Sequence, residues 1–156
     1  MQQSSFLTDW DETDFGELDF YDLFDVFYPQ IYHRKIPWQS GKNAGNSIAY
    51  GIPSKEFESV IQKFLNVKTD ILREKTIYRE KDDTYEYYPR GFYESEYPEH
   101  PYPEVTAFQE NDDGTVTLTV HAVFPYLGSS RALVHEVTCA RWKMTAAAVQ
   151  YVSNKI

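Results

Sequence analysis

Residues 115–124 constrain the fold more than any other segment, because polar and apolar side chains alternate from Thr115 to Ala122. The segment reads TVTLTVHAVF and has an apolar residue at every second position from Val116 to Phe124. Successive side chains of a β-strand point to opposite faces of a sheet, so this pattern predicts a strand with one buried face. Such a strand needs antiparallel neighbours beside it and a cover over its apolar face.

Three further segments supply the neighbouring strands. The turn sequence NDDG stands just before the first strand, so residues 105–110 are expected to form a hairpin with it. Downstream, LVHEVTCARW alternates in the same way, and VQYVSN supplies a last strand. The four segments together predict an antiparallel four-stranded β-meander.

The register between the two long strands follows from matching their apolar residues. Placing Val120 opposite Val137 brings apolar side chains together along the whole pairing. The same register places His121 opposite Glu136 on the other face of the sheet. A carboxylate beside an imidazole can orient it as a general base. An exposed ion pair worth ~0–1 kcal/mol is the favoured interpretation of this pair.

Two amphipathic segments upstream predict the helices that cover the sheet. Residues 15–28 carry phenylalanine and leucine at helical spacing, with Asp14 as the expected cap and Pro29 as the expected end. A second helix is predicted over residues 54–66, with Ser54 as its N-cap and one continuous apolar stripe. A further helical turn is expected to begin at Thr69.

These elements predict an α+β fold in which N-terminal helices pack on one face of the meander. The expected core combines side chains of the sheet and of the second helix: Val116, Leu118, Val120, Ala122, Phe57, Ile61 and Phe64. The alternative is a cone-shaped fold of the nuclear transport factor two-like or cystatin-like kind, which also places helices before a curved meander. The length of 156 residues fits a single domain, residues 1–156.

Acidic residues are concentrated in an aromatic N-terminal segment, residues 1–33. This segment has eight carboxylates and no lysine or arginine, and the whole chain has a net charge of −9. Since lysine and arginine drive phosphate binding, a nucleic-acid partner is disfavoured. The carboxylates from Asp9 to Glu17 are dense enough to suggest calcium. An EF-hand loop, however, requires glycine and glutamate where Asp14 and Phe20 stand, so no metal site is expected.

The sequence gives no positive support for catalysis or for a cofactor. Cys139 is the single cysteine, so it forms no intrachain disulfide, and its strand spacing is typical of a small buried side chain. The four histidines lack metal-ligand spacing, and no nucleophile elbow or phosphate-binding loop is present. His135, on the apolar face, is expected to be a hydrogen-bonded core histidine.

Residues 87–104 are rich in tyrosine, proline and glutamate and form the candidate binding segment. Tyrosine offers a large, rigid contact area with a polar tip, and exposed clusters of it mark binding surfaces. The acidic residues beside the rings favour a basic peptide or a hydroxyl-rich glycan. The favoured alternative is that the segment covers the sheet with its rings. The candidate binding residues are Tyr88, Phe92, Tyr93, Tyr97 and Tyr102.

A resemblance to a known family rests on four stretches of the chain. They read GIPSKEFESVIQKFLNVKTDILREKTIY, PEVTAFQENDDGTVTLTVHAV, HEVTCARW and YVSNKI, within residues 50–156. In these stretches the chain resembles uncharacterised surface lipoproteins of Gram-positive bacteria, a domain of unknown function. The resemblance implies an extracytoplasmic domain, anchored through a lipidated cysteine that would lie upstream of Met1. The opening MQQSSFLTDW has no basic or apolar export region, which leaves a cytoplasmic location as the alternative.

Two functional hypotheses follow. The first is a non-catalytic extracytoplasmic domain that binds an envelope or extracellular partner through residues 87–104. The second is a small-molecule-binding or enzymatic domain with a pocket between sheet and helices, which would require polar side chains around His135. No stretch of the sequence approaches the ~18 apolar residues of a membrane-spanning helix.

Overall fold

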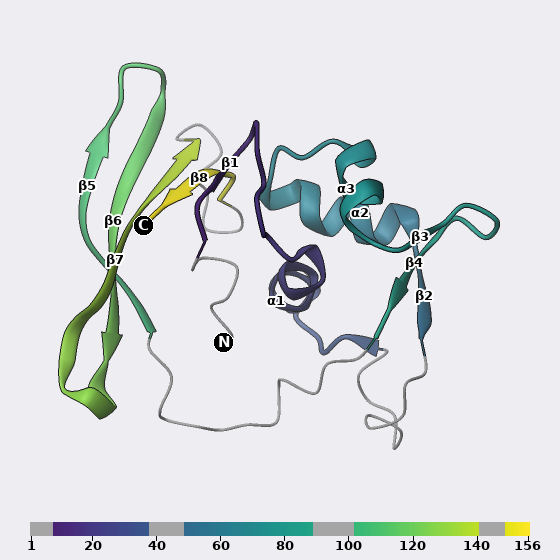
Figure 1. The fold of residues 1–156 in the computed structure, drawn as a ribbon, viewed down its shortest axis with the longest axis horizontal. Coiled ribbons are helices and arrows are strands. Elements are labelled where there is room, and N and C mark those ends of the chain that lie inside the picture. Colours follow the sequence, from purple (N-terminus) through teal and green to yellow (C-terminus); the bar gives the residue numbers. More distant parts are fainter. Residues whose placement is uncertain (1–7, 38–48, 89–101, 141–148) are drawn as a thin grey trace. The chain divides into compact units, whose positions relative to one another are not determined.

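The computed structural model describes residues 8–37, 49–88, 102–140 and 149–156. The chain divides into two compact units, which are described separately (Figure 1). The sheet unit comprises Met1–Leu18 and Ser95–Ile156, and the helical unit comprises Asp19–Glu94. The single domain over residues 1–156 stays a prediction.

The sheet unit contains a five-stranded antiparallel sheet with the order β1-β8-β7-β6-β5. Its strands are β1 (Trp10–Asp11), β5 (Tyr102–Glu110), β6 (Thr115–Phe124), β7 (Ser129–Ala140) and β8 (Tyr151–Lys155). The predicted meander corresponds to strands β5 to β8. The predicted number of four strands is wrong, however, because β1 pairs with β8 and adds a fifth strand to the sheet. A strand of two residues is too short to show alternation in the sequence.

The register between β6 and β7 differs by two residues from the predicted one. Glu136 lies opposite Thr119, and His121 lies opposite Val134, so the predicted direct pair of His121 and Glu136 is wrong. A shift of two residues leaves every side chain on its predicted face, whereas a shift of one would exchange the faces. Matching of apolar residues therefore could not separate the two registers.

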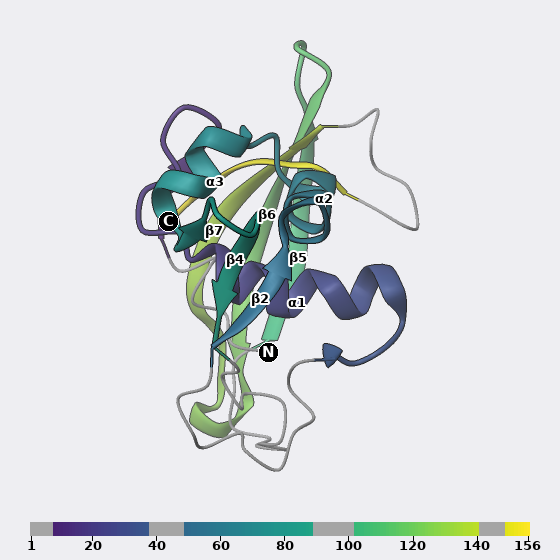
Figure 2. The same cartoon turned by 90° about the vertical axis from the view of Figure 1, so that its right-hand side faces the viewer.

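The pairing of β6 with β7 becomes irregular between Ala122 and Phe124, next to the connection of the two strands. The 3₁₀ helix η3 (Pro125–Leu127) closes the connection tightly, and Phe124 lies opposite Ser129. The predicted common apolar face is present, since Val120, Val137 and Cys139 form a buried cluster. At the other end of β6, the β5–β6 hairpin projects beyond the described ends of β7 and β8 (Figures 1 and 2).

In its described residues, the helical unit has three α-helices and a sheet of its own with the order β2-β4-β3. Its elements are α1 (Phe20–Tyr32), β2 (Tyr50–Pro53), α2 (Ser54–Phe64), α3 (Thr69–Lys75), β3 (Tyr78–Arg79) and β4 (Thr84–Tyr87). The predicted α+β class is confirmed. The strands of the described ranges nevertheless form two antiparallel sheets, and the smaller one was not predicted because its strands have only two to four residues.

Helix α1 begins and ends later than predicted. Its N-cap is Asp19, whose carboxylate accepts hydrogen bonds from the backbone of Tyr21 and Asp22, whereas Asp14 accepts one from Gly16 in the preceding turn. Pro29 lies inside the helix. Proline removes its own backbone donor and crowds the carbonyl of the residue four positions earlier, but the helix continues for one more turn here, and His33 closes that turn in a left-handed conformation.

Helix α2 packs its apolar stripe inside the helical unit. The Phe57 ring stacks on Phe24 of α1 at 5.1 Å and on Tyr85 of β4 at 4.4 Å, and Phe64 stacks on Phe27 at 4.1 Å. The N-cap is Pro53 rather than Ser54, whose hydroxyl instead donates to Asp83. The expected contact of this stripe with the β6 residues involves both units and stays a prediction.

Candidate interaction surface

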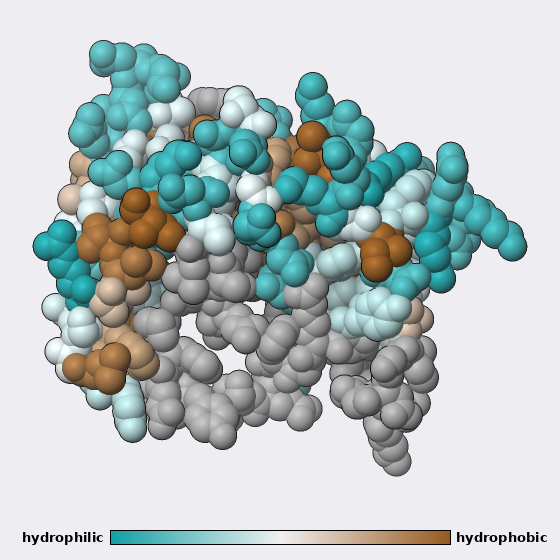
Figure 3. Space-filling model, in the orientation of Figure 1, coloured by the Kyte–Doolittle hydropathy of each residue, from teal (hydrophilic) through white to brown (hydrophobic). Residues whose placement is uncertain are grey.

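Strand β5 carries large apolar side chains on the surface of the sheet unit. All nine of its residues are exposed, and the exposed fractions of Phe108, Val105 and Tyr102 are 70%, 56% and 52%. The strand lies at the end of the sheet order, and no strand of the described ranges pairs with its outer edge. In Figure 3, apolar surface gathers over the part of the sheet formed by β5, β6 and β7. We call Tyr102, Glu104, Val105, Phe108 and Glu110 the β5 surface.

The β5–β6 turn is held by its own side chains. Gly114 has φ +83°, a conformation that favours glycine, and the Asn111 amide donates to the hydroxyls of Thr115 and Thr117 at 2.8 and 2.9 Å. Asp113 accepts from both the backbone and the hydroxyl of Thr115, and these bonds lower the pKa of its carboxyl. The turn therefore fixes how β5 lies along β6.

The pairing with β6 assigns the β5 side chains to faces. Val105 lies opposite Val120 and Phe108 opposite Leu118, on the apolar face of the sheet. Glu104 lies on the other face, opposite His121. Both apolar side chains on β5 are exposed although their neighbours on β6 are wholly or partly buried. The apolar face of the sheet therefore extends onto β5, where its apolar side chains are exposed to solvent.

The predicted binding residues are only partly described. Tyr102 is the first residue of β5, and it is exposed. Tyr88 is also exposed and donates a hydrogen bond to Glu86, but it belongs to the helical unit. Phe92, Tyr93 and Tyr97 lie outside the described residues. The turn signal assigned residues 105–110 of β5 to a strand, and no pattern in these residues indicated that their apolar side chains are exposed.

The family assignment rests on a match over almost the whole chain. A family of unknown function, DUF6070, matches residues 2–156. The chain belongs to this family. The match includes the N-terminal acidic segment, which the four resembling stretches do not. No match was found among curated proteins or among solved structures, so the analogy with cone-shaped folds stays a prediction.

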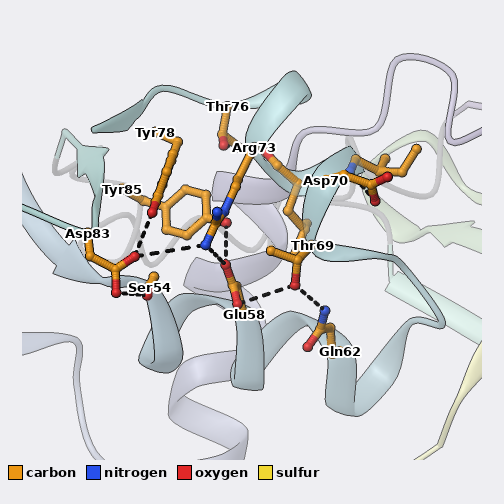
Figure 4. A network of polar contacts seen from close by, with 12 residues as sticks. Ser54, Glu58, Gln62, Thr69, Asp70, Arg73, Thr76, Tyr78, Asp83 and Tyr85 are labelled. Atoms are coloured by element: carbon orange, nitrogen blue, oxygen red, sulfur yellow. Dashed lines mark hydrogen bonds and ion pairs between the residues drawn. The ribbon is translucent and has the colours of Figure 1, made fainter. Parts of the chain in front are cut away.

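A second group of polar residues in this DUF6070 member lies in the helical unit (Figure 4). Glu58 of α2 accepts hydrogen bonds from the Tyr85 hydroxyl at 2.8 Å and the Thr69 hydroxyl at 3.3 Å, and Arg73 lies 3.5 Å away. Burial and the bond to Glu58 raise the pKa of Tyr85. One carboxylate thus joins α2, α3 and β4.

Asp83 makes a similar junction beside it. Its carboxylate accepts from the Tyr78 hydroxyl at 2.6 Å and from the Ser54 hydroxyl at 2.8 Å. The Arg73 guanidinium lies over the Tyr78 ring, 4.1 Å from its centroid, and 3.9 Å from Asp83. The carboxylates of Glu58 and Asp83 both accept hydrogen bonds from donors of the helical unit. We therefore interpret this polar group as a structural network that stabilises the unit. Its partners are up to 29 positions apart, and no spacing in the sequence indicated it.

His135 lies in the core of the sheet unit, as predicted. It is 7% exposed, and its Nδ1 lies 2.8 Å from Oδ1 of Asn154, which is fully buried. The Asn154 amide nitrogen donates to the backbone carbonyl of Thr8, so its oxygen faces the imidazole and can only accept. Nδ1 of His135 therefore carries the proton. This bond supports the core-histidine interpretation, and the pocket around His135 stays a prediction.

The N-terminal carboxylates bind backbone and hydroxyl donors of their own unit. Asp9 accepts from the backbone of Ile156, and Asp11 accepts from the Thr13 backbone and hydroxyl at 2.8 and 2.6 Å. In the described ranges, no three His, Cys, Asp or Glu side chains are grouped as metal ligands. No helix there has the length and apolar character of a membrane span.

Substitution of Asp11 by asparagine should flatten the acid side of the stability profile. Hydrogen bonds from Thr13, then one from the Asp14 backbone, lower the Asp11 pKa from 3.8 to about 2. A carboxyl that is more acidic in the folded state stabilises the fold above pH 3.8, and this contribution is lost as the pH falls towards 2. Thermal melts across this window should therefore show a smaller loss of stability in Asp11→Asn than in the wild type. Glu12→Gln is the matched control, and an equal flattening there would refute the assignment.

Cys139 is unsuited to nucleophilic chemistry in the folded chain. Its side chain is fully buried, and desolvation raises the pKa of its thiol to about 11. A thiolate is the reactive form of cysteine, so the folded state disfavours it at neutral pH. The side chain contributes to the core beside Val120 and Val137.

Proposed function

We propose that this chain is a non-catalytic binding module that engages an envelope or extracellular partner through the β5 surface and the preceding residues of the 87–104 segment. The exposure of Val105 and Phe108 at the margin of the sheet carries the proposal. Exposed apolar side chains gathered along one strand are typical of protein interaction sites. Tyr102 adds an aromatic ring with a polar tip, of the kind enriched at interfaces.

The same proposal places the module outside the cytoplasm. It is supported by the resemblance to Gram-positive surface lipoproteins, which implies a lipid anchor attached to an upstream cysteine. Fractionation of cells that express the complete gene product is the direct measurement. Recovery in the membrane fraction with incorporation of labelled palmitate supports the anchor, and recovery in the cytoplasm contradicts it.

Binding of the purified chain to an envelope fraction tests the role of the β5 surface. The variant Val105→Ser/Phe108→Ser removes two apolar side chains and leaves the strand backbone in place. We expect it to lose at least about tenfold in affinity, as removal of central interface residues commonly does. The spectrum of the folded state should be unchanged, since both side chains are exposed.

A matched control is available on the same unit. Tyr126 and Leu127 of η3 are 69% and 67% exposed, so Tyr126→Ser/Leu127→Ser removes a similar apolar area. This variant should bind as the wild type does. Equal binding by both variants and the wild type, or an equal loss in both variants, would contradict the assignment of binding to β5.

A further inference from the structure

The turn between β5 and β6 contains Asp113–Gly114, the only Asp–Gly step in the chain. An Asp–Gly step readily closes a five-membered ring, because glycine has no side chain that shields its backbone nitrogen from the aspartate carboxyl. Among the described residues, no atom lies within 4 Å of the place where a Cβ on Gly114 would stand. Both residues are exposed, so water can reach the ring and open it.

The folded turn binds the carboxyl that would react. Oδ1 of Asp113 accepts a hydrogen bond from the Thr115 backbone at 2.9 Å and one from the Thr115 hydroxyl at 2.7 Å. These bonds stabilise the ionised carboxylate and lower the pKa of Asp113. Ring closure requires the neutral carboxylic acid, since a carboxylate would have to expel an oxide ion. The two bonds from Thr115 therefore reduce the amount of the reactive form.

The turn also holds the nitrogen that would attack. The backbone N–H of Gly114 donates to the carbonyl of Asn111 at 3.2 Å, and Asn111 in turn donates its N–H to the carbonyl of Thr115 at 2.9 Å. The bond from Gly114 must break before the nitrogen can lose its proton and bind Cγ of Asp113. Both reacting groups are thus restrained by hydrogen bonds that exist only in the folded turn.

We infer that Asp113–Gly114 is a site of spontaneous isoaspartate formation, and that the folded turn slows this reaction through Thr115. In the first step the Gly114 nitrogen bonds to Cγ of Asp113, and the amide proton leaves with the carboxyl hydroxyl as one water. In the second step one water opens the succinimide ring. Cleavage of the new bond restores aspartate, whereas cleavage of the original peptide bond gives isoaspartate. The inference goes beyond the proposed function and does not rest on it.

The product changes the backbone of the turn. In isoaspartate the chain runs through Cβ and Cγ of residue 113, and the former backbone carbonyl becomes a free carboxylate. The backbone between Asn111 and Thr115 is then longer by one carbon. Because the length of its turn fixes the register of a hairpin, the longer turn no longer fits the hydrogen bond from Asn111 to Thr115. The reaction should therefore loosen the pairing of β5 with β6 next to the turn.

Incubation of the purified chain at neutral pH, folded in buffer and unfolded in guanidinium chloride, tests the inference. Electron-transfer fragmentation of the peptide that contains residue 113 separates isoaspartate from aspartate, which have the same mass. We expect isoaspartate to form at least about fivefold more slowly in the folded chain, the factor that corresponds to one hydrogen bond. Equal rates would overturn the restraint by the turn. An unfolded chain without isoaspartate at residue 113 would overturn the site.

Variants at Thr115 locate the restraint. Thr115→Val removes the hydroxyl bond and keeps the backbone donor, so the folded variant should react at least about threefold faster than the wild type. Thr115→Ser keeps the hydroxyl and should react as the wild type does. Thr117→Val is the matched control, since that hydroxyl binds Asn111 and Thr138. An equal acceleration in both valine variants would overturn the role of the Thr115 hydroxyl.

Two further measurements separate the fold from the local sequence. In guanidinium chloride all of these chains should react at the same rate, and a faster Thr115→Val there would trace its effect to the sequence alone. If Thr115→Val does not fold, the comparison of folded and unfolded wild type still decides. The Asn111 amide should exchange its hydrogen at least about fivefold faster in the isolated isoaspartate form than in the unreacted chain. Unchanged exchange would overturn the predicted loosening of the hairpin.

Discussion

Replacement of Phe57 by alanine is expected to lower the free energy of unfolding of the helical unit by about 3–5 kcal/mol. Phe57 has no exposed surface and stacks between Phe24 of α1 and Tyr85 of β4. It also packs against Tyr21, at 5.5 Å between ring centroids. Truncation removes the contacts that join two helices and the small sheet, and it leaves a cavity that rigid rings cannot fill.

Hydrogen exchange of the α1 and α2 amides measures this effect within the unit. Ile77→Ala is the matched control, since the Ile77 side chain is 53% exposed and its backbone bonds remain. It should change the free energy of unfolding by less than about 1 kcal/mol. A loss in Phe57→Ala no larger than in this control would show that Phe57 is not central to the core.

Replacement of Asn154 by alanine is expected to destabilise the sheet unit by about 2–3 kcal/mol, since it leaves buried polar groups without partners. Asn154 is fully buried on β8 and binds both His135 on β7 and the backbone of Thr8 before β1. Alanine would leave the His135 N–H and the Thr8 carbonyl without these bonds. It would also weaken the attachment of β1, since Trp10 lies opposite Asn154.

A double-mutant cycle that combines Asn154→Ala with His135→Leu separates the stabilisation by the His135–Asn154 hydrogen bond from the stabilisation by side-chain packing. If the two side chains form one polar unit, the double variant should be more stable than the sum of the single effects predicts, by about 1–2 kcal/mol. Asn111→Ala, which removes amide bonds in the exposed β5–β6 turn, is the matched control and should cost less. Additive effects of the Asn154 and His135 changes would argue against the proposed bond.

Segments with a long apolar pattern were predicted well. The alternation of residues 115–124 identified β6 and its buried face, and the stripe that includes Phe57 and Phe64 identified α2. The start of α1 was predicted less well, because Asp14 and Asp19 are both residues of the kind that cap a helix. Only the position of the backbone donors shows that Asp19 is the cap and that Asp14 belongs to the turn before it.

The candidate site was predicted in part. The abundance of tyrosine, proline and glutamate indicated residues 87–104 as the candidate binding segment. Tyr102 of this segment lies at the start of the exposed strand β5. Val105 and Phe108 were expected to belong to an ordinary hairpin strand. Their exposure depends on β5 being the last strand of the sheet, and strand order is a property of the whole sheet.

The sequence by itself determined the secondary-structure class, the long strands and helices, and the face of each strand that carries apolar residues. These features follow from the periodic spacing of apolar residues, which is a local property of the sequence. The spacing assigns the same faces when the register between two strands shifts by two residues. The tertiary structure decided the register of His121 and Glu136, the addition of β1, the small second sheet and the position of β5 at the end of the sheet order. Those features depend on hydrogen bonds between residues far apart in the chain, such as Asn154 and Thr8, which leave no periodic signal.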